Sequence, residues 1–176
     1  EFDSTTSSVT VDAATGPQLA GVRTGQVMPF VTDAVIHLGR DARVACVGAD
    51  SSQLAAALSA VCRADALNTS ELASLQWGSD GRLGNYDAIV IDFRAASAVA
   101  AADAGRQLLW TDVPVEERVQ VLQTLKSLAK ALRPSSRFLD GRRPKRTHFV
   151  LVNASGNRLE SITRGLLATP PSTFTS

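Results

Sequence analysis

The stretch Asn85-Tyr-Asp-Ala-Ile-Val-Ile-Asp-Phe-Arg94 decides the fold class of this chain of 176 residues. Its centre, Ala88 to Ile91, is an unbroken apolar run rich in β-branched residues, which is typical of a strand covered on both faces. Such strands occur in parallel sheets that carry helices on either side. The stretch therefore predicts an α/β fold, and it places Asp92 and Arg94 at the carboxyl edge of the sheet, where ligands of open α/β sheets bind.

The segments on either side of this strand alternate between strand and helix patterns. Strand patterns occupy 43–47, 147–153 and, together with a short connection, part of 66–75. Helix patterns occupy 51–62 and 157–167, while 27–38 fits a helix or a strand and 95–104 fits a helix or a loose connection. Strands and helices that alternate at these lengths predict a three-layer α/β domain with a mainly parallel sheet.

The segment 114–132 carries the clearest helix pattern of the chain. Apolar residues follow the 3.6-residue period over about five turns, at Val115, Val119, Leu122, Leu125, Leu128, Ala129 and Leu132. Acidic residues occupy the first turn and basic residues the last, which complements the helix dipole, and Pro134 stops the helix. The pattern predicts one long helix with an apolar stripe.

Composition and charge limit the classes of protein to which the chain can belong. Apolar residues make up 44% and charged residues 20%, which is ordinary for a globular domain with a core. The net charge of +1 gives the whole chain no bias toward nucleic acid or an anionic membrane. No apolar run approaches the roughly 18 residues of a membrane span. We expect a soluble protein, most simply a cytoplasmic one, that binds neither nucleic acid nor membrane.

A single α/β domain is expected over 19–168. Residues 1–18 are rich in Ser, Thr, Ala and Gly and predict a flexible or arm-like segment, and 169–176 predicts a polar tail or linker. The two cysteines, Cys46 and Cys62, fall in a predicted strand and a predicted helix. We therefore expect buried free thiols rather than a disulfide framework.

The turn after the first core strand, Val47 to Ser52, is where a dinucleotide-binding site would lie. It holds one glycine, Gly48, whereas the dinucleotide-binding motif has three. Asp50 places a negative charge where the phosphate of such a ligand would bind. A structural turn with a capping Asp or Ser is the favoured interpretation. A divergent nucleotide site at the strand ends stays open as the alternative, with Gly48, Asp50, Asp92 and Ser155 as its candidate residues.

The sequence holds no complete catalytic or metal-binding motif. The histidines, His37 and His148, have neither triad nor metal spacing, and Tyr86 lacks the lysine four positions later that short-chain reductases use. Asp92 has the position of the phospho-acceptor of receiver domains, but the acidic pair of that family is incomplete and its later lysine has no candidate. We therefore predict no catalytic residue, no metal and no cofactor, and interpret Asp92 as a capping or loop-anchoring residue.

Four segments together carry a resemblance to a known family: Arg43-Val-Ala-Cys-Val-Gly48, Tyr86-Asp-Ala-Ile-Val-Ile-Asp92, Leu125 to Pro134, and Phe149-Val-Leu-Val-Asn-Ala-Ser155. Their layout resembles the core of short-chain dehydrogenases/reductases. More closely, it resembles the non-catalytic amino-terminal domain of high-molecular-weight 3-oxoacyl-carrier-protein reductases and the structural half of ketoreductase modules. The resemblance implies a Rossmann-like or flavodoxin-like fold without catalytic residues, joined to a reductase domain of fatty acid or polyketide synthesis.

The loop 133–146 is the one local excess of charge, and it is longer and more basic than in that family. Beside Arg133, its basic residues are the candidate partner-binding set Arg137, Arg142, Arg143, Lys145 and Arg146, opposed by Asp140 alone. A solvated, mobile loop is the favoured interpretation, and the functional alternative is a surface that binds an anion or an acidic protein such as an acyl carrier. Few aromatic residues accompany the charges, so base stacking with nucleic acid is not expected.

The function expected from the sequence is a non-catalytic scaffold or dimerisation domain of a larger reductase or multienzyme assembly. An adjoining domain, a protein partner or a second copy of the chain would bind it. Two alternatives remain: a divergent nucleotide-binding domain, and a partner- or anion-binding module that uses residues 133–146.

Overall fold

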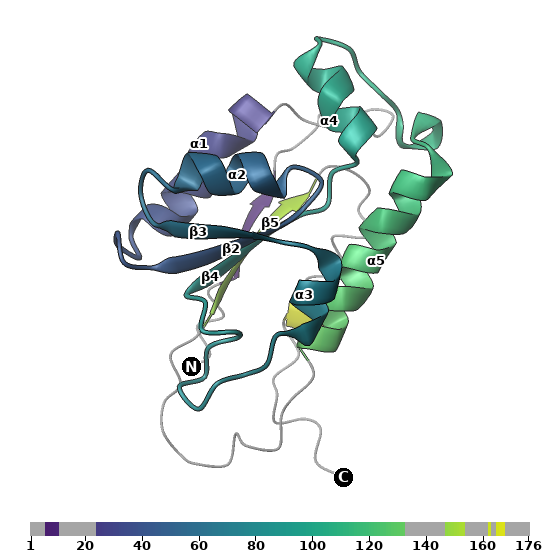
Figure 1. The fold of residues 1–176 in the computed structure, drawn as a ribbon. Coiled ribbons are helices and arrows are strands. Elements are labelled where there is room, and N and C mark those ends of the chain that lie inside the picture. Colours follow the sequence, from purple (N-terminus) through teal and green to yellow (C-terminus); the bar gives the residue numbers. More distant parts are fainter. Residues whose placement is uncertain (1–5, 11–23, 133–146, 154–161, 163–164, 168–176) are drawn as a thin grey trace.

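The computed structural model describes residues 6–10, 24–132, 147–153, 162 and 165–167. Within these residues, parallel strands form one sheet in the order β1-β5-β4-β2-β3 (Figure 1). The strands are β1 Thr6–Thr10, β2 Arg43–Gly48, β3 Arg63–Leu67, β4 Ala88–Asp92 and β5 His148–Asn153. The helices are α1 Thr24–Ile36, α2 Ser51–Leu58, α3 Thr69–Ser74, α4 Ala96–Asp103 and α5 Val115–Ala131, and a 3-10 turn, η1 Trp110–Asp112, precedes α5. The predicted α/β fold with a parallel sheet is confirmed.

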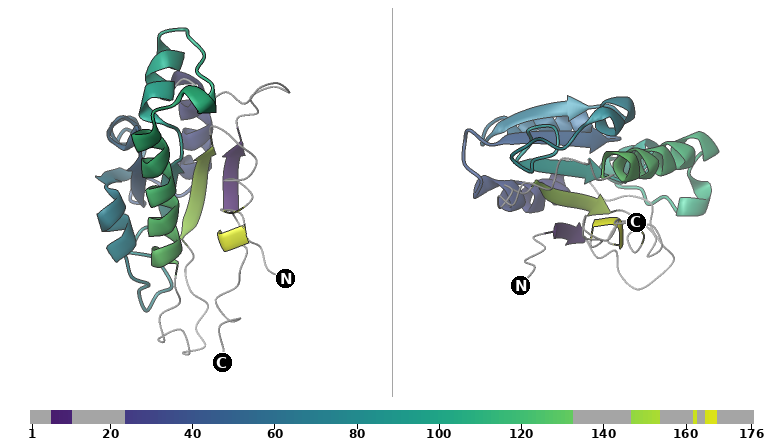
Figure 2. Two further views of the ribbon diagram at one scale, coloured as in Figure 1. Left: turned by 90° about the vertical axis from the view of Figure 1, so that its right-hand side faces the viewer. Right: turned by 90° about the horizontal axis from the view of Figure 1, so that it is seen from below.

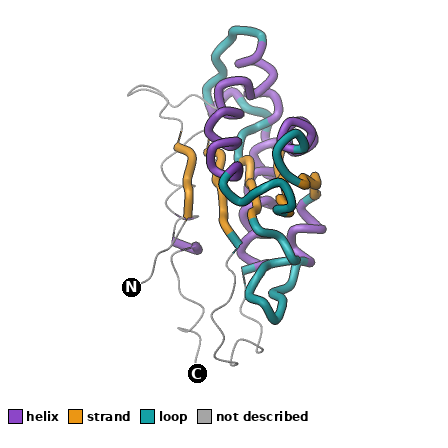
Figure 3. The backbone as a smooth tube through the Cα atoms, turned by 90° about the vertical axis from the view of Figure 1, so that its left-hand side faces the viewer, coloured by secondary structure: helices purple, strands orange, loops and turns teal. Residues whose placement is uncertain are grey.

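Alternate residues of the strands face opposite layers of helices. One core cluster joins Val44 and Cys46 of β2 to α1 and α2, and a second joins Ala45 and Val47 to α3 and α5. Because successive side chains of a strand point to opposite faces, the two clusters lie on the two sides of the sheet. Every residue of β4 is buried, as a central strand covered on both faces requires. Figures 2 and 3 show the sheet between its two helix layers.

The order of the strands places a switch point between β2 and β4. Strands β3, β2, β4 and β5 follow the order 2-1-3-4 of a flavodoxin-like sheet, and β1, which pairs with β5, takes the position of the fifth strand. The segment expected as an arm therefore contributes an edge strand. The chain leaves β2 for β3 on one side and returns to β4 on the other, so ligands of this fold class bind at the carboxyl ends of β2 and β4.

Several predicted elements are confirmed by the structure. They are the strands at 43–47, 87–92 and 147–153 and the helix at 114–132. The two open segments, 27–38 and 95–104, are the helices α1 and α4. The helix predicted for 157–167 lies mostly outside the described residues, of which 162 and 165–167 are helical.

The end of α2 differs from the prediction. The helix stops at Leu58 rather than at residue 62, and the backbone N–H groups of Val61 and Cys62 donate to the carbonyl oxygen of Leu58 to close a turn into β3. Val61 and Cys62 pack against the same core cluster as the helix. Their apolar side chains extend the periodic pattern although the backbone has already left the helix.

The strand predicted within 66–75 is wrong beyond Leu67. The strand β3 starts at Arg63, and residues 69–74 form α3 instead. Arg63 and Asp65 are exposed, which suits an edge strand because charges there discourage pairing with another chain. The same charges hide the apolar alternation by which a strand is recognised.

The two cysteines are free and buried, as predicted. Burial raises the pKa of the Cys46 thiol to about 12. Among the described helices, none combines the length and the apolar character needed to cross a membrane.

Candidate functional site

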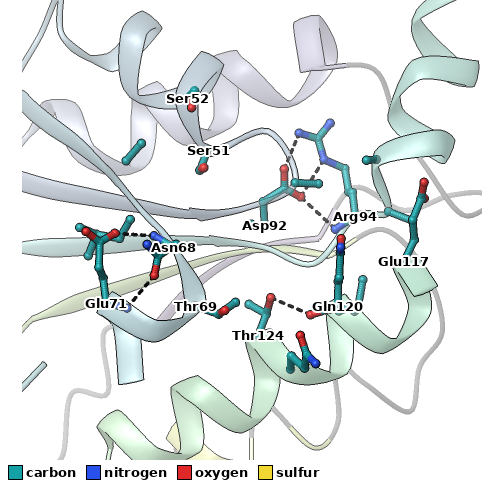
Figure 4. A pocket seen from close by; sticks show the side chains of 18 residues that line it. Ser51, Ser52, Asn68, Thr69, Glu71, Asp92, Arg94, Glu117, Gln120 and Thr124 are labelled. Carbon is teal, nitrogen blue, oxygen red and sulfur yellow. Dashed lines mark hydrogen bonds and ion pairs between the residues drawn. The ribbon is translucent and has the colours of Figure 1, made fainter. Parts of the chain in front are cut away.

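A pocket of about 580 Å³ opens at the switch point of the sheet. The ends of β2, β3 and β4 form its floor, and the amino-terminal half of α5 forms its wall (Figure 4). Its polar lining consists of Ser51, Ser52, Asn68, Thr69, Glu71, Asp92, Arg94, Glu117, Gln120, Gln123 and Thr124. The pocket therefore occupies the place where flavodoxin-like folds bind their ligands.

Asp92 and Arg94 form a buried ion pair at the back of this pocket. Both side chains are fully buried, and Arg94 Nη2 donates to Asp92 Oδ2 at 2.9 Å. The other oxygen, Oδ1, accepts the backbone N–H and Nε of Arg94, both at 2.9 Å. The carboxylate thus fixes the loop after β4 through the backbone and the guanidinium together. This contact agrees with the interpretation of Asp92 as a loop-anchoring residue.

The charge of Arg94 is shared with a second carboxylate. Arg94 Nη2 lies 3.7 Å from Oδ2 of Asp50, the residue that precedes α2. Asp50 occupies the N-cap position, but its side chain makes no capping hydrogen bond. Two acidic residues from neighbouring strand ends therefore face one guanidinium.

The pKa of Asp92 reflects a competition between burial and Arg94. Burial raises the pKa of the Asp92 carboxyl, and the nearby charge of Asp50 raises it further. The hydrogen bonds and the positive charge of Arg94 lower it. The ionised form of Asp92 therefore depends on Arg94, because water cannot reach the carboxylate to solvate it.

Gly48 brings β2 unusually close to β4. The two residues Gly48 and Asp92 are direct partners in the parallel register, and Gly48 has a φ of +124°. A Cβ atom at position 48 would overlap the carbonyl oxygen of Asp92 and lie 2.8 Å from the Asp92 Cβ. The close packing of β2 against β4 therefore requires a glycine at position 48. This packing explains the glycine without a role in phosphate binding.

The other two carboxylates of the pocket also have partners. Glu71 Oε2 accepts the backbone N–H of Asn68 at 2.7 Å, and Asn68 Oδ1 accepts the N–H of Glu71 at 2.8 Å, which forms a capping box at the start of α3. Glu117 Oε2 accepts the backbone N–H and the hydroxyl of Ser97 at 2.9 and 2.6 Å, and so holds the first turn of α4 against α5. Both glutamate carboxylates are thus engaged in hydrogen bonds that stabilise the first turns of α3 and α4.

The structure brings together three of the four predicted nucleotide-site residues. Gly48, Asp50 and Asp92 meet at the switch point, whereas Ser155 lies outside the described residues. The predicted partner-binding residues of the basic loop, Arg137, Arg142, Arg143, Lys145 and Arg146, also lie outside them. The site that can be described is therefore formed by strand ends and α5.

The two histidines lie next to each other, and neither lines the pocket. His148 is the first residue of β5, at the amino edge of the sheet and opposite to the pocket, and its ring meets that of His37 edge-on at 5.9 Å. Within the described part of the chain, no three His, Cys, Asp or Glu side chains gather in a group that could hold a metal ion. The pocket can hold a ligand through hydroxyl and amide groups, but its described lining offers no histidine or cysteine for acid–base or nucleophilic chemistry.

Sequence reasoning placed Arg94 near the site but did not foresee its burial. The available signal was the spacing, because residues two apart in an extended strand point to the same side. An Asp and an Arg at this spacing after a fully apolar run can pair without any other element. No sequence pattern predicts that Gln120 and Gln123 of α5 line the pocket, because their position depends on how α5 packs against the sheet.

Comparison of the chain with models of protein families, with curated proteins and with solved structures found no match.

Proposed function

We propose that this chain is a non-catalytic α/β scaffold domain of a larger reductase or multienzyme assembly. The observation that carries the proposal is the buried ion pair of Asp92 and Arg94. Of the described residues that line the pocket, Arg94 is the one cation, and its guanidinium faces two carboxylates. A phosphate entering this pocket would meet the carboxylates of Glu71 and Glu117 and find the positive charge of Arg94 already engaged.

The turn after β2 supports the same proposal. A dinucleotide-binding turn uses several glycines so that its backbone can approach a pyrophosphate. Here Gly48 is explained by its contact with the backbone of Asp92, and the next positions carry side chains. The resemblance to the non-catalytic domain of carrier-protein reductases points to the same class of protein.

The proposal predicts that the chain does not bind NADP(H). Isothermal titration of NADPH and NADP⁺ into the protein is expected to give no saturable heat at concentrations up to about 1 mM. The control is an NADPH-dependent reductase titrated with the same ligand solution. A dissociation constant in the micromolar range would contradict the scaffold proposal.

A second candidate function is the binding of a nucleoside, which carries no phosphate. The observation that favours it is the pocket itself, which lies at the switch point and is lined by the hydroxyl and amide groups of Ser51, Ser52, Thr69, Gln120 and Gln123. Such groups can pair with ribose hydroxyls and a base edge. The surrounding carboxylates disfavour anionic ligands and not neutral ones.

This second candidate predicts that adenosine binds more tightly than AMP, by at least about tenfold, because AMP brings its charge toward the carboxylates that line the pocket. The variant Ser52→Trp, which fills the pocket from α2, should abolish the heat of adenosine binding. Ser59→Trp, at the exposed far end of the same helix, is the matched control and should leave it unchanged. If adenosine gives no heat with the unaltered protein, this candidate is wrong.

A further inference from the structure

The lining of the pocket carries an excess of negative charge. Its described residues include the acidic Glu71, Asp92 and Glu117, and Arg94 is the one basic residue among them. Asp92 and Arg94 are fully buried and pair with each other, so the two glutamates supply the charge that a ligand would meet. Glu71 is exposed and Glu117 is half-buried. The pocket therefore favours positively charged ligands over anionic ones.

Each of these glutamates has one carboxylate oxygen that is not used for structure. The contacts of Glu71 with Asn68 and of Glu117 with Ser97 go to Oε2. Within the described part of the chain, neither Oε1 atom accepts a hydrogen bond or pairs with a cation. Both oxygens are therefore able to accept hydrogen bonds from a ligand.

The helix ends near the pocket do not reverse this preference. Unpaired N–H groups at the amino end of a helix favour anions. At α2, Asp50 occupies the N-cap position, and its carboxylate offsets the positive end of the helix dipole. At α3, the capping box already uses the N–H groups of Asn68 and Glu71. Acidic side chains thus balance the amino ends of both helices.

The two glutamates lie on opposite sides of the pocket. Strand β2 lies between β3 and β4 in the sheet. Glu71 belongs to α3, which follows β3, whereas Glu117 is bonded to Ser97 in α4, which follows β4. Figure 4 shows Thr69 and Gln120 between the two glutamates. The pocket thus has a carboxylate at each end and uncharged groups between the two ends.

We propose that the pocket binds a linear aliphatic diamine, with one ammonium group on Oε1 of Glu71 and the other on Oε1 of Glu117. An ammonium group has three donors and no acceptor, which suits a carboxylate oxygen that lacks a protein partner. The methylene chain then lies over the ends of β2 and β3, where the small residues Gly48, Ala49 and Ala66 line the pocket. The inference goes beyond the proposed scaffold function, which requires no ligand at this pocket.

The first test compares ligands of different length and charge. Diamines from propane-1,3-diamine to octane-1,8-diamine are titrated into the full chain by calorimetry at low ionic strength. The affinity should pass through a maximum at the length that joins the two carboxylates, with a dissociation constant below about 1 mM. The monoamine of the same chain length should bind at least about tenfold more weakly, because it reaches one carboxylate only.

The second test removes the charges and keeps the structural contacts. In Glu71→Gln and Glu117→Gln, the amide oxygen can still accept from Asn68 or Ser97, and glutamine is accepted in a capping box. Each variant should weaken binding of the best diamine at least about fivefold. Glu116→Gln is the matched control, because it removes the same charge from the exposed residue next to Glu117, which does not line the pocket. Its affinity should be unchanged, and urea unfolding verifies that all three variants fold.

The remaining outcomes also decide. If no diamine gives saturable heat with the unaltered chain, the proposal is overturned. An affinity that rises steadily with chain length and tolerates both pocket variants would assign the heat to apolar contacts and overturn it as well. An equal loss in Glu116→Gln would assign binding to the general charge of the surface, with the same consequence. None of these results bears on the calorimetry with NADPH, so a failure here can be separated from a failure of the scaffold function.

Discussion

The variant Arg94→Met is expected to lose about 3–5 kcal/mol of its free energy of unfolding, because removal of one partner leaves a buried charge uncompensated. The side chains of Asp92 and Arg94 are fully buried, and the structure gives the carboxylate three hydrogen bonds, all from Arg94. The backbone donor of Arg94 survives the substitution, while both guanidinium contacts are lost. Urea unfolding followed by circular dichroism measures the effect.

Two further variants establish that the loss comes from the unpaired charge. The double variant Asp92→Leu, Arg94→Met removes both partners and should recover much of the stability, since replacing a buried pair by apolar residues is often neutral. Arg63→Met breaks the exposed pair with Asp41 and is expected to change stability by no more than about 0.5 kcal/mol. A loss in the double variant as large as in Arg94→Met would contradict this account.

The pH dependence of the same variant follows from the direction of the pKa shift. Burial raises the pKa of Asp92 even beside Arg94, and removal of the Arg94 groups that lower this pKa raises it further, so the folded variant binds a proton still more readily than the unfolded chain. Stability then falls as the pH rises above the ordinary carboxyl value of 3.8. The difference between the unaltered chain and Arg94→Met should therefore shrink as the pH is lowered toward that value. Urea unfolding at several pH values checks this sign.

The sequence predicted those parts of the fold whose local pattern agrees with their final environment. Ala88 to Ile91 is apolar throughout and is buried throughout, so its pattern and its environment agree. The strand β3 could not be recognised, because an edge strand is half exposed and carries charges such as Arg63. The capping box of Asn68 and Glu71 was present in the sequence and would have marked the start of α3.

The functional surfaces were harder to predict, for two physical reasons. The position of Asp92 at the switch point follows from the strand pattern, but its pairing with a buried Arg94 depends on how closely the surrounding elements exclude water. In α5, apolar residues occur on both sides of the helix, and periodicity alone does not say which side meets the sheet. Val119 belongs to the predicted stripe and is exposed, whereas Val121 lies outside that stripe and is buried.

The variant Gly48→Ala is expected to lose about 3 kcal/mol or more of stability, because a backbone strain and a steric overlap add at one position. The φ of +124° disfavours any residue with a Cβ atom, and that atom would overlap the carbonyl oxygen of Asp92. Relief requires that β2 and β4 separate at the pair of Gly48 and Asp92, which is where the loop with Arg94 begins. Thermal unfolding measures the loss.

Two other glycines separate the two contributions to this effect. At Gly39 the φ is +92° but nothing lies within 4 Å of an added Cβ, so Gly39→Ala reports strain alone and should cost about 1–2 kcal/mol. At Gly25, in the first turn of α1, there is neither a positive φ nor a neighbour, and Gly25→Ala should leave stability unchanged or raise it by up to about 1 kcal/mol. The excess of Gly48→Ala over Gly39→Ala then measures the close approach of the two strands. If the two variants lose equal stability, the contact of Gly48 with Asp92 does not constrain the site, and the glycine must be explained by its backbone conformation only.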